Sequence, residues 1–230
     1  MPGERVTDEE LKAALDVVFR ANAAVYAERG FQRRIGFGDK AALIVIDLAN
    51  AWTRPDHAFS CAGMDTIIPA NQRLLEAFRA RGLPVVFTTT AYDVTEGPHS
   101  DMGRWVQKIP LETLPAGSEA AAIDDRLAPR PDELVIVKKM ASAFHGTPLA
   151  AFLTAQKVDT IVVTGVTACA CVRHTIEDGL ANGFRPIAVR EAIGDRIAGA
   201  VEWNLFDIDA KFGDVMDLEA VLDHFRKNAP

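Results

Sequence analysis

The feature that most constrains the fold is a regular alternation of short apolar runs with amphipathic segments. Residues 41–46 (AALIVI) form a continuous apolar run, as in a strand that is buried on both faces. Further strands are predicted at 84–90, 134–137, 159–164, 186–190 and 214–216, and helices at 64–81, 147–156, 170–182, 199–211 and 217–227. Strands that alternate with helices require crossover connections, so the sequence predicts an α/β fold with a parallel sheet.

Two segments stand outside this alternation. A helix is predicted at residues 7–28, where Thr7 and Glu10 have the spacing of a capping box and Gly30 is placed to end the helix. Residues 91–133 are interpreted as a long surface excursion that serves as a lid or a subunit contact. Its prolines are Pro98, Pro110, Pro115, Pro129 and Pro131. Because no linker or internal repeat is found, residues 1–230 are expected to form a single domain with the 7–28 helix as an N-terminal arm.

The composition excludes several classes of partner. The formal net charge is −7, which disfavours binding to nucleic acid. No stretch approaches the roughly 20 uninterrupted apolar residues that cross a bilayer, and the first residues lack the pattern of a signal peptide, so no membrane partner is expected. Three cysteines are too few for a disulfide framework, and free thiols indicate the cytoplasm.

Reactive side chains follow three of the predicted strands. Asp47 follows the first strand, Lys138 follows the third, and Cys171 lies in the turn after the fourth. The carboxyl ends of parallel strands form the edge where open α/β sheets bind ligands. A carboxylate, a cation and a thiol at that edge form a combination suited to acyl transfer.

Each of these residues also has an ordinary structural interpretation. Cys171 is expected in the first turn of a helix, where free N–H groups and the helix dipole stabilise a thiolate and an oxyanion, but buried packing cysteines are common. Cys169 is a rival that we expect to pack rather than react. Asp47 could instead cap a loop. A lysine after a strand is usually solvated. Because adjacent side chains at a strand end face opposite ways, this alternation helps to choose which of Lys138 and Lys139 faces the site.

Three stretches of the sequence resemble the signatures of the isochorismatase-like cysteine hydrolases. They are residues 46–53 (IDLANAWT), 138–147 (KKMASAFHGT) and 164–175 (TGVTACACVRHT). Residues 28–36, 59–64 and 203–209 match as well, so the resemblance covers nearly the whole chain, and within the superfamily it is strongest to amidases of ureido acids. It implies a three-layer α/β/α sandwich with a mainly parallel six-stranded sheet, preceded by an N-terminal helix.

The resemblance also assigns roles to individual residues. It implies that Asp47 accepts and donates the proton, that Lys138 is its charged partner and that Cys171 is the nucleophile. It places a cis peptide bond between Val166 and Thr167, which would turn the N–H of Thr167 toward an oxyanion beside the N–H of Cys171. Many relatives carry glycine where this chain has Ala170, so the turn must hold φ values that alanine allows there.

Two further residues are candidates for binding the substrate. Arg196 matches an arginine of the amidase pattern and would bind a carboxylate, although a surface ion pair with Asp195 or Asp207 is an equal alternative. Trp52 stands where relatives have a pocket aromatic and would pack an N-methyl group, with an ordinary core position as the alternative.

No cofactor is expected, and no metal site is predicted. Nicotinamidase relatives bind a metal through an Asp-x-His element, whereas Asp56 and His57 are adjacent in this chain. The amidases that the chain resembles are homotetramers, so the resemblance implies that the chain associates with itself, as a homotetramer.

The resemblance implies cleavage of the terminal carbamoyl C–N bond of N-carbamoylsarcosine, giving sarcosine, carbon dioxide and ammonia through a thiocarbamoyl enzyme. The alternatives are a related amidase that acts on maleamate, another ureido acid or a nicotinamide-like amide; a thiol redox protein that uses Cys169 and Cys171; and a nucleotide-binding module. No Cys-x-x-Cys, Gly-x-Gly-x-x-Gly or Walker motif supports the last two.

Overall fold

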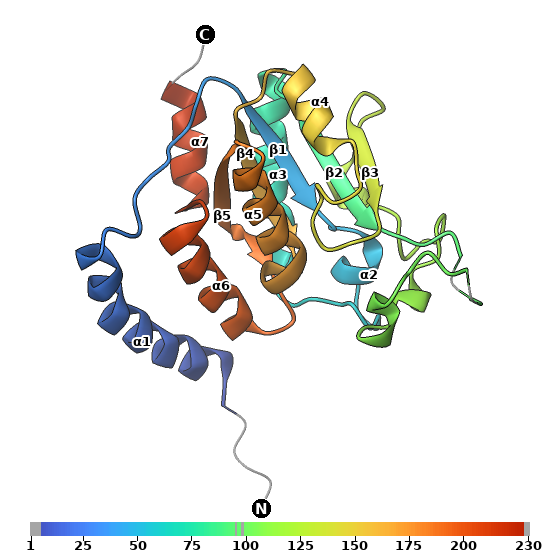
Figure 1. Cartoon of the computed structure of the whole chain (residues 1–230), viewed down its shortest axis with the longest axis horizontal. Coiled ribbons are helices and arrows are strands. Elements are labelled where there is room, and N and C mark those ends of the chain that lie inside the picture. The colour runs from blue at the N-terminus through green and yellow to red at the C-terminus, as the bar shows by residue number, and fades with distance from the viewer. Residues whose placement is uncertain (1–5, 95, 98, 228–230) are drawn as a thin grey trace, which may run out of the picture.

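Figure 1 shows a computed structural model of the chain, which describes residues 6–94, 96–97 and 99–227. The first residues, on which the expectation of no signal peptide rests, and Pro98 lie outside these ranges. The helices and strands are α1 (Asp8–Glu28), β1 (Ala41–Ile46), α2 (Asn50–Thr53), α3 (Met64–Ala80), β2 (Val85–Thr90), β3 (Leu134–Lys138), α4 (Leu149–Ala155), β4 (Thr160–Val166), α5 (Arg173–Ala181), β5 (Arg185–Gly194), α6 (Ala198–Lys211), β6 (Asp214–Met216) and α7 (Leu218–Lys227).

The six strands form one sheet in the order β3-β2-β1-β4-β5-β6, and every neighbouring pair is parallel. The prediction of a parallel α/β sheet is therefore confirmed. The apolar run of β1 lies near the centre, where Ile44 is opposite Val86 of β2 and Val163 of β4. All six residues of β1 are buried, as the run without polar residues predicts.

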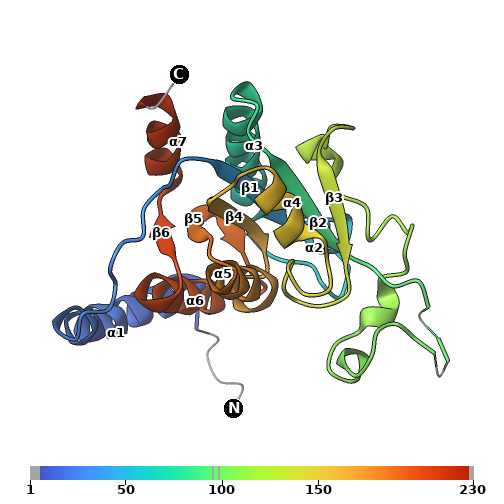
Figure 2. The ribbon, with the colours of Figure 1, turned by 45° about the horizontal axis from the view of Figure 1, so that its top comes forward.

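Helices cover both faces of the sheet, which gives three layers (Figure 2). Side chains alternate along β1, so Leu43 and Val45 join the core beneath α3 and α7. Ile44 and Ile46 join the second core, beneath α4, α5 and α6. This arrangement places the carboxyl ends of β1, β2, β3 and β4 at one edge of the sheet, the edge where the candidate residues were expected.

The boundaries differ from the predictions at two places that matter for the site. The helix predicted at 170–182 begins as a π-helical turn, Ala168–Val172, before α5. The strand predicted to end at residue 190 continues to Gly194, so Arg196 follows the strand end closely. The short helix α2 was not predicted, because four residues carry no helical periodicity.

Glycine is required at position 165, where β4 passes close to β1. Gly165 has φ +101°, and an added Cβ would lie 2.0 Å from the carbonyl oxygen of Ile46. A side chain would therefore collide with the backbone that leads directly to Asp47.

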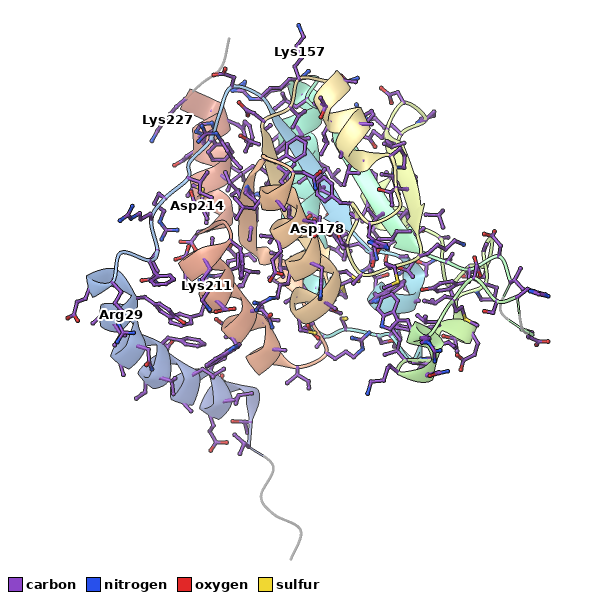
Figure 3. The ribbon with its side chains drawn as sticks, viewed as in Figure 1. Arg29, Lys157, Asp178, Lys211, Asp214 and Lys227 are labelled. Carbon is purple, nitrogen blue, oxygen red and sulfur yellow. The ribbon has the colours of Figure 1, made fainter. Side chains whose placement is uncertain are left out.

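The N-terminal helix α1 lies against α6 rather than on the sheet (Figure 2). The capping box of Thr7 and Glu10 is present, and Phe19 stacks on Phe206 of α6 with ring centroids 4.4 Å apart. The segment that leads to β1 is tied down by Asp214, labelled in Figure 3, whose carboxylate accepts hydrogen bonds from the N–H groups of Ile35 and Gly36. Of the helices in the described ranges, none combines the length and the apolar character that crossing a membrane would require.

The described residues of the 91–133 segment are hydrogen-bonded and packed against the rest of the domain, more closely than the predicted surface excursion implies. Their N-terminal part pairs with itself, since the N–H of Tyr92 donates to Leu114. Their C-terminal part bonds to the loop after β1 and to α2: the N–H of Asp124 donates to the carbonyl of Leu48, and the N–H of Asn50 donates to the carbonyl of Ala122. Buried apolar side chains, Leu114 among them, hold the segment in place, and it forms one wall of the cavity described next.

Candidate active site

A cavity of about 370 Å³ opens at the carboxyl edge of the sheet. Its walls are mostly apolar and aromatic, with Trp52 from α2, Phe59 from the following loop, and Trp105 from the 91–133 segment. Cys171 lines the cavity. Of the described residues that line it, Arg196 alone is charged. Such a site suits a small substrate that is anchored by one anionic group.

Asp47 is the first residue after β1 and is fully buried. Its backbone has φ +48°, an uncommon value for a residue with a side chain. The carboxylate accepts hydrogen bonds from Thr88 Oγ1 at 2.8 Å and from Thr90 Oγ1 at 3.3 Å, and it pairs with Lys138 Nζ at 2.7 Å. Three buried donors therefore surround a single buried carboxylate.

Lys138 ends β3 and is also fully buried. Its ammonium contacts Asp47, donates to Thr90 Oγ1 at 2.8 Å and to the carbonyl of Met140 at 3.1 Å, and lies 3.4 Å from Cys171 Sγ. Burial is the largest single effect and lowers the pKa of Lys138, but the charge of Asp47, together with Cys171 and the hydrogen bonds to both, outweighs it. The pKa is therefore raised, and the ammonium keeps its proton. Lys139 points the other way, toward Asp93 and Asp101, as the alternation of strand side chains indicates.

Cys171 lies in the π-helical turn before α5 and is 6% exposed. Burial raises the pKa of its thiol to about 12; Lys138 acts to lower it and Asp47 to raise it. A pKa raised in this way favours the protonated thiol. The expectation that free N–H groups at the helix start stabilise a thiolate stays a prediction.

Cys169 does not pack as expected. It is exposed and lines the cavity, and its backbone N–H donates to Asp195 Oδ2 at 3.0 Å. Partial desolvation at the cavity wall raises the pKa of Cys169, and hydrogen bonding to Asp195 raises it further. All three cysteines, Cys61, Cys169 and Cys171, are free. Ala170 takes no positive φ, so the missing glycine is tolerated in this turn.

The turn also supplies backbone groups to the cavity. The peptide bond between Val166 and Thr167 is cis. Thr167 and Cys171 both line the cavity, so their N–H groups are the candidate donors to an oxyanion there.

Arg196 and Trp52 both line the cavity. Within the described part of the chain, Arg196 forms no ion pair; Asp207 pairs with Arg173 and Lys211 instead. The guanidinium of Arg196 donates to the carbonyl of Phe59 at 3.2 Å and lies 5.5 Å from the centre of its ring. The surface ion pair weighed for Arg196 is thus absent from the described residues. Trp52 is 3% exposed and is both a cavity wall and part of the core, so its two interpretations are not exclusive.

Sequence reasoning missed three residues of this site, Thr88, Thr90 and Phe59. The threonines carry the one available signal, since residues i and i+2 of a strand share a face and both lie near its end. Phe59 carries no periodic signal, because it lies in an irregular loop, although it begins the stretch 59–64 that resembles the family.

The described residues contain no cluster of three or more histidine, cysteine, aspartate or glutamate side chains that could hold a metal ion. The arrangement instead joins a proton acceptor, a buried cation and a thiol at one end of an apolar cavity. These are the parts that nucleophilic attack on a carbonyl group requires.

Comparisons with known proteins agree with this chemistry. A family model described as the isochorismatase domain matches residues 41–220. The chain is 56% identical over 220 residues to an N-carbamoylsarcosine amidase from an Arthrobacter species, an alignment that covers 94% of this chain and 83% of that protein. It is 39% identical over 196 residues to a maleamate amidohydrolase from Pseudomonas putida, covering 84% and 91% of the two chains.

Solved structures give the same picture. A cysteine hydrolase from Pseudomonas syringae superposes with a TM-score of 0.76 at 26% identity, covering 82% of this chain and 93% of that one. An N-carbamoylsarcosine amidase from Thermoplasma acidophilum superposes with a TM-score of 0.65 at 26% identity, covering 79% and 98%. The six-stranded parallel sheet with helices on both faces is therefore shared with hydrolases of this fold.

Proposed function

The chain belongs to the isochorismatase family and is an amide-hydrolysing enzyme, and from that premise we propose that it hydrolyses N-carbamoylsarcosine with Cys171 as the nucleophile. One observation carries the proposal: Lys138 Nζ lies 2.7 Å from Asp47 Oδ2 and 3.4 Å from Cys171 Sγ, beside the cavity. The 56% identity to an N-carbamoylsarcosine amidase supports the choice of substrate.

The first step is transfer of the thiol proton from Cys171 to Asp47 as the sulfur attacks the ureido carbonyl carbon. A thiol with a pKa of about 12 needs such an acceptor to react near neutral pH. Lys138 stays protonated and offsets the negative charge that moves onto sulfur. The proton therefore remains inside the buried cluster, and no net charge is created there.

The attack forms a C–S bond and moves an electron pair onto the carbonyl oxygen. The N–H groups of Thr167 and Cys171 stabilise this oxyanion, and one such donor is worth about 3–4 kcal/mol in comparable sites. Collapse of the intermediate breaks the C–N bond, and Asp47 returns its proton to the leaving ammonia. The product of this half-reaction is a thiocarbamoyl enzyme.

Water completes the cycle. Asp47 takes a proton from the water as its oxygen attacks the thiocarbamoyl carbon, and the C–S bond then breaks, with the proton returning to sulfur. The released N-carboxysarcosine decomposes to sarcosine and carbon dioxide. Atoms balance with one water consumed and no oxidant or cofactor required.

Arg196 and Trp52 recognise the substrate in this proposal. The guanidinium of Arg196 binds the carboxylate of the substrate, because it lines the cavity and has no acidic partner among the described residues. Trp52 packs against the N-methyl group from the apolar wall. Both groups stand at the cavity that Cys171 lines.

Maleamate is the second candidate substrate. It also carries a primary amide and a carboxylate, and a maleamate amidohydrolase is 39% identical to the chain. The same three residues would act on its amide carbonyl. The choice between the two substrates therefore rests on the shape of the cavity wall rather than on the catalytic cluster.

The test is release of ammonia from N-carbamoylsarcosine and from maleamate, with and without iodoacetamide. We expect faster turnover of N-carbamoylsarcosine and loss of both activities after alkylation. Cys171→Ala should abolish turnover, and Cys169→Ala, the matched control in the same turn, should retain most of it. Retained activity in Cys171→Ala together with lost activity in Cys169→Ala would reverse the assignment of the nucleophile.

We also propose that residues 1–230 form one domain that assembles as a homotetramer, and that the protein works in the cytoplasm, where free thiols persist. Exposed apolar side chains on α1 and α6 support self-association: Val17 is 67% exposed, Val25 40% and Trp203 49%. Light scattering should give about four times the 25.0 kDa mass of the chain. Val17→Glu should weaken assembly; a monomer for the unaltered chain would contradict the proposal.

A further inference from the structure

Three consecutive threonines end β2, and they divide between the two faces of the sheet. Thr88 and Thr90 direct their hydroxyl groups to the carboxylate of Asp47. Thr89, between them, donates to the carbonyl of Ala121 on the 91–133 segment at 2.7 Å. All three side chains are buried, so the two sets of hydrogen bonds are shielded from water.

The hydroxyl groups of Thr88 and Thr90 each accept a hydrogen bond from a donor, and this determines where their own protons point. The N–H of Asp47 donates both to the carbonyl of Thr88, at 3.1 Å, and to Thr88 Oγ1, at 3.2 Å. Thr90 Oγ1 accepts a hydrogen bond from Lys138 Nζ at 2.8 Å. A backbone N–H and an ammonium can only donate. Each hydroxyl must therefore point its own proton at the carboxylate, Thr88 at Oδ1 and Thr90 at Oδ2.

We propose that Thr88 and Thr90 are positioning residues, which hold the carboxylate of Asp47 aimed at the thiol of Cys171 with one acceptor position open. A carboxylate has about four acceptor positions on its two oxygens. Thr88, Thr90 and Lys138 fill three of them. The remaining position is left for the proton of Cys171. This inference rests on the proposed role of Asp47 and adds two groups that control when it can accept a proton.

The consequence is a dependence of activity on pH. The titratable groups that face Asp47 are Lys138 from β3, Cys171 from the turn before α5, and Tyr92, whose pKa is raised by burial and to a smaller extent by the charges of Cys171, Asp101 and Asp47. Removing the Thr88 hydroxyl leaves a lone pair of Oδ1 buried without a donor. A buried carboxylate oxygen that lacks a donor binds a proton from solvent more readily, and a carboxyl group that holds this proton cannot accept the one from sulfur.

The test is the pH profile of kcat/KM for Thr88→Val, which keeps the shape of the side chain and removes the hydroxyl. A hydrogen bond to a charged group corresponds to a shift of about one to two pH units. We expect the acidic limb of the profile to move to higher pH by that amount, and we expect kcat/KM to recover as the pH is raised toward about 9. KM should change by less than about threefold, because Thr88 does not line the cavity.

Three companion variants make the result specific. Thr88→Ser keeps the hydroxyl and should restore the acidic limb of the unaltered chain. Thr89→Val removes a buried hydroxyl from the same strand but from the other face, and it should leave the limb in place. Thr90→Val should shift the limb in the same direction by a smaller amount, since its bond to Oδ2 is 3.3 Å long and Oδ2 keeps Lys138. Thr90→Val also carries the test if Thr88→Val does not fold.

Three results would overturn the inference: an unmoved acidic limb in Thr88→Val, a loss of activity that no increase in pH restores, or an equal shift in Thr89→Val. The profile is measured on whichever amide the chain hydrolyses. Failure on N-carbamoylsarcosine with turnover of maleamate would thus refute the proposed substrate and leave this test intact. Full activity of Cys171→Ala would refute the proposed chemistry itself, whatever the threonine variants do.

Discussion

Replacing Lys138 with methionine removes one charge from a pair in which both side chains are completely buried. At 2.7 Å, and with an effective dielectric constant of about 20, the attraction between Lys138 and Asp47 is about 6 kcal/mol before desolvation is counted. Burial of both charges offsets part of this. The cost of removing only one partner is about 3–5 kcal/mol, because the carboxylate of Asp47 stays buried without its counter-ion.

The double variant separates the ion pair from packing. Asp47→Asn alone leaves the ammonium of Lys138 unpaired, so it should also lose about 3–5 kcal/mol in free energy of unfolding. Lys138→Met combined with Asp47→Asn leaves no buried charge, and it should be more stable than either single variant. For a chain of this size each kcal/mol corresponds to about 2–4 °C in Tm, so the single variants should melt about 6–20 °C lower.

The assay is denaturant and thermal unfolding of all four proteins, followed by circular dichroism. The pKa of Lys138 is raised in the folded state by Asp47, so its contribution to stability is complete below the ordinary lysine pKa and is lost as the pH rises through the folded value. The advantage of the unaltered chain over the double variant should therefore shrink above about pH 10.4. Losses that add in the double variant to within about 0.5 kcal/mol would refute the coupling between the two residues.

Three other predictions follow from single contacts. Burial alone would raise the pKa of Asp124, but hydrogen bonds, first of all from Arg126, hold that pKa well below its usual range. Asp124→Asn should therefore lower the free energy of unfolding by about 1–3 kcal/mol at pH 7. Urea titrations should show this difference fading as the pH falls below about 4. Arg196→Met should raise KM about tenfold or more for a carboxylate substrate and by less than about twofold for an uncharged urea analogue; equal increases would contradict carboxylate binding. Gly165→Ala, whose Cβ would collide with the carbonyl of Ile46, should lower the free energy of unfolding by at least about 3 kcal/mol; an unchanged Tm would contradict the close approach.

The sheet was predictable because its signal is local. The apolar run of β1 can be buried only between two layers of helices, and a strand buried on both faces needs parallel neighbours with crossovers. The end of β5 was missed because Glu191 interrupts the apolar pattern while the backbone pairing continues to Gly194. Backbone hydrogen bonds to β4, which no sequence pattern reports, hold that extension in place.

The cluster was predictable in part. Strand ends and the alternation of side chains separate Lys138, which is buried, from Lys139, which bonds to Asp93 and Asp101. The state of Cys171 was not predictable, since its pKa depends on burial and on a carboxylate more than 120 residues away in sequence. The partner of the Thr88 hydroxyl was hidden for the same reason, because Asp47 follows the neighbouring strand β1.

The measurement that tests the central claim most directly is mass spectrometry of the enzyme quenched with acid during turnover of N-carbamoylsarcosine. The mechanism predicts one substituted carbamoyl group, the substrate less ammonia and still carrying the sarcosine moiety, on the peptide that contains Cys171, and the adduct should map to that sulfur in fragment spectra. It should be absent from Lys138→Met and from Cys171→Ala. A carbamoyl group found on Cys169 instead, or steady turnover by a chain that lacks the Cys171 sulfur, would contradict the claim that this thiol carries the acyl group.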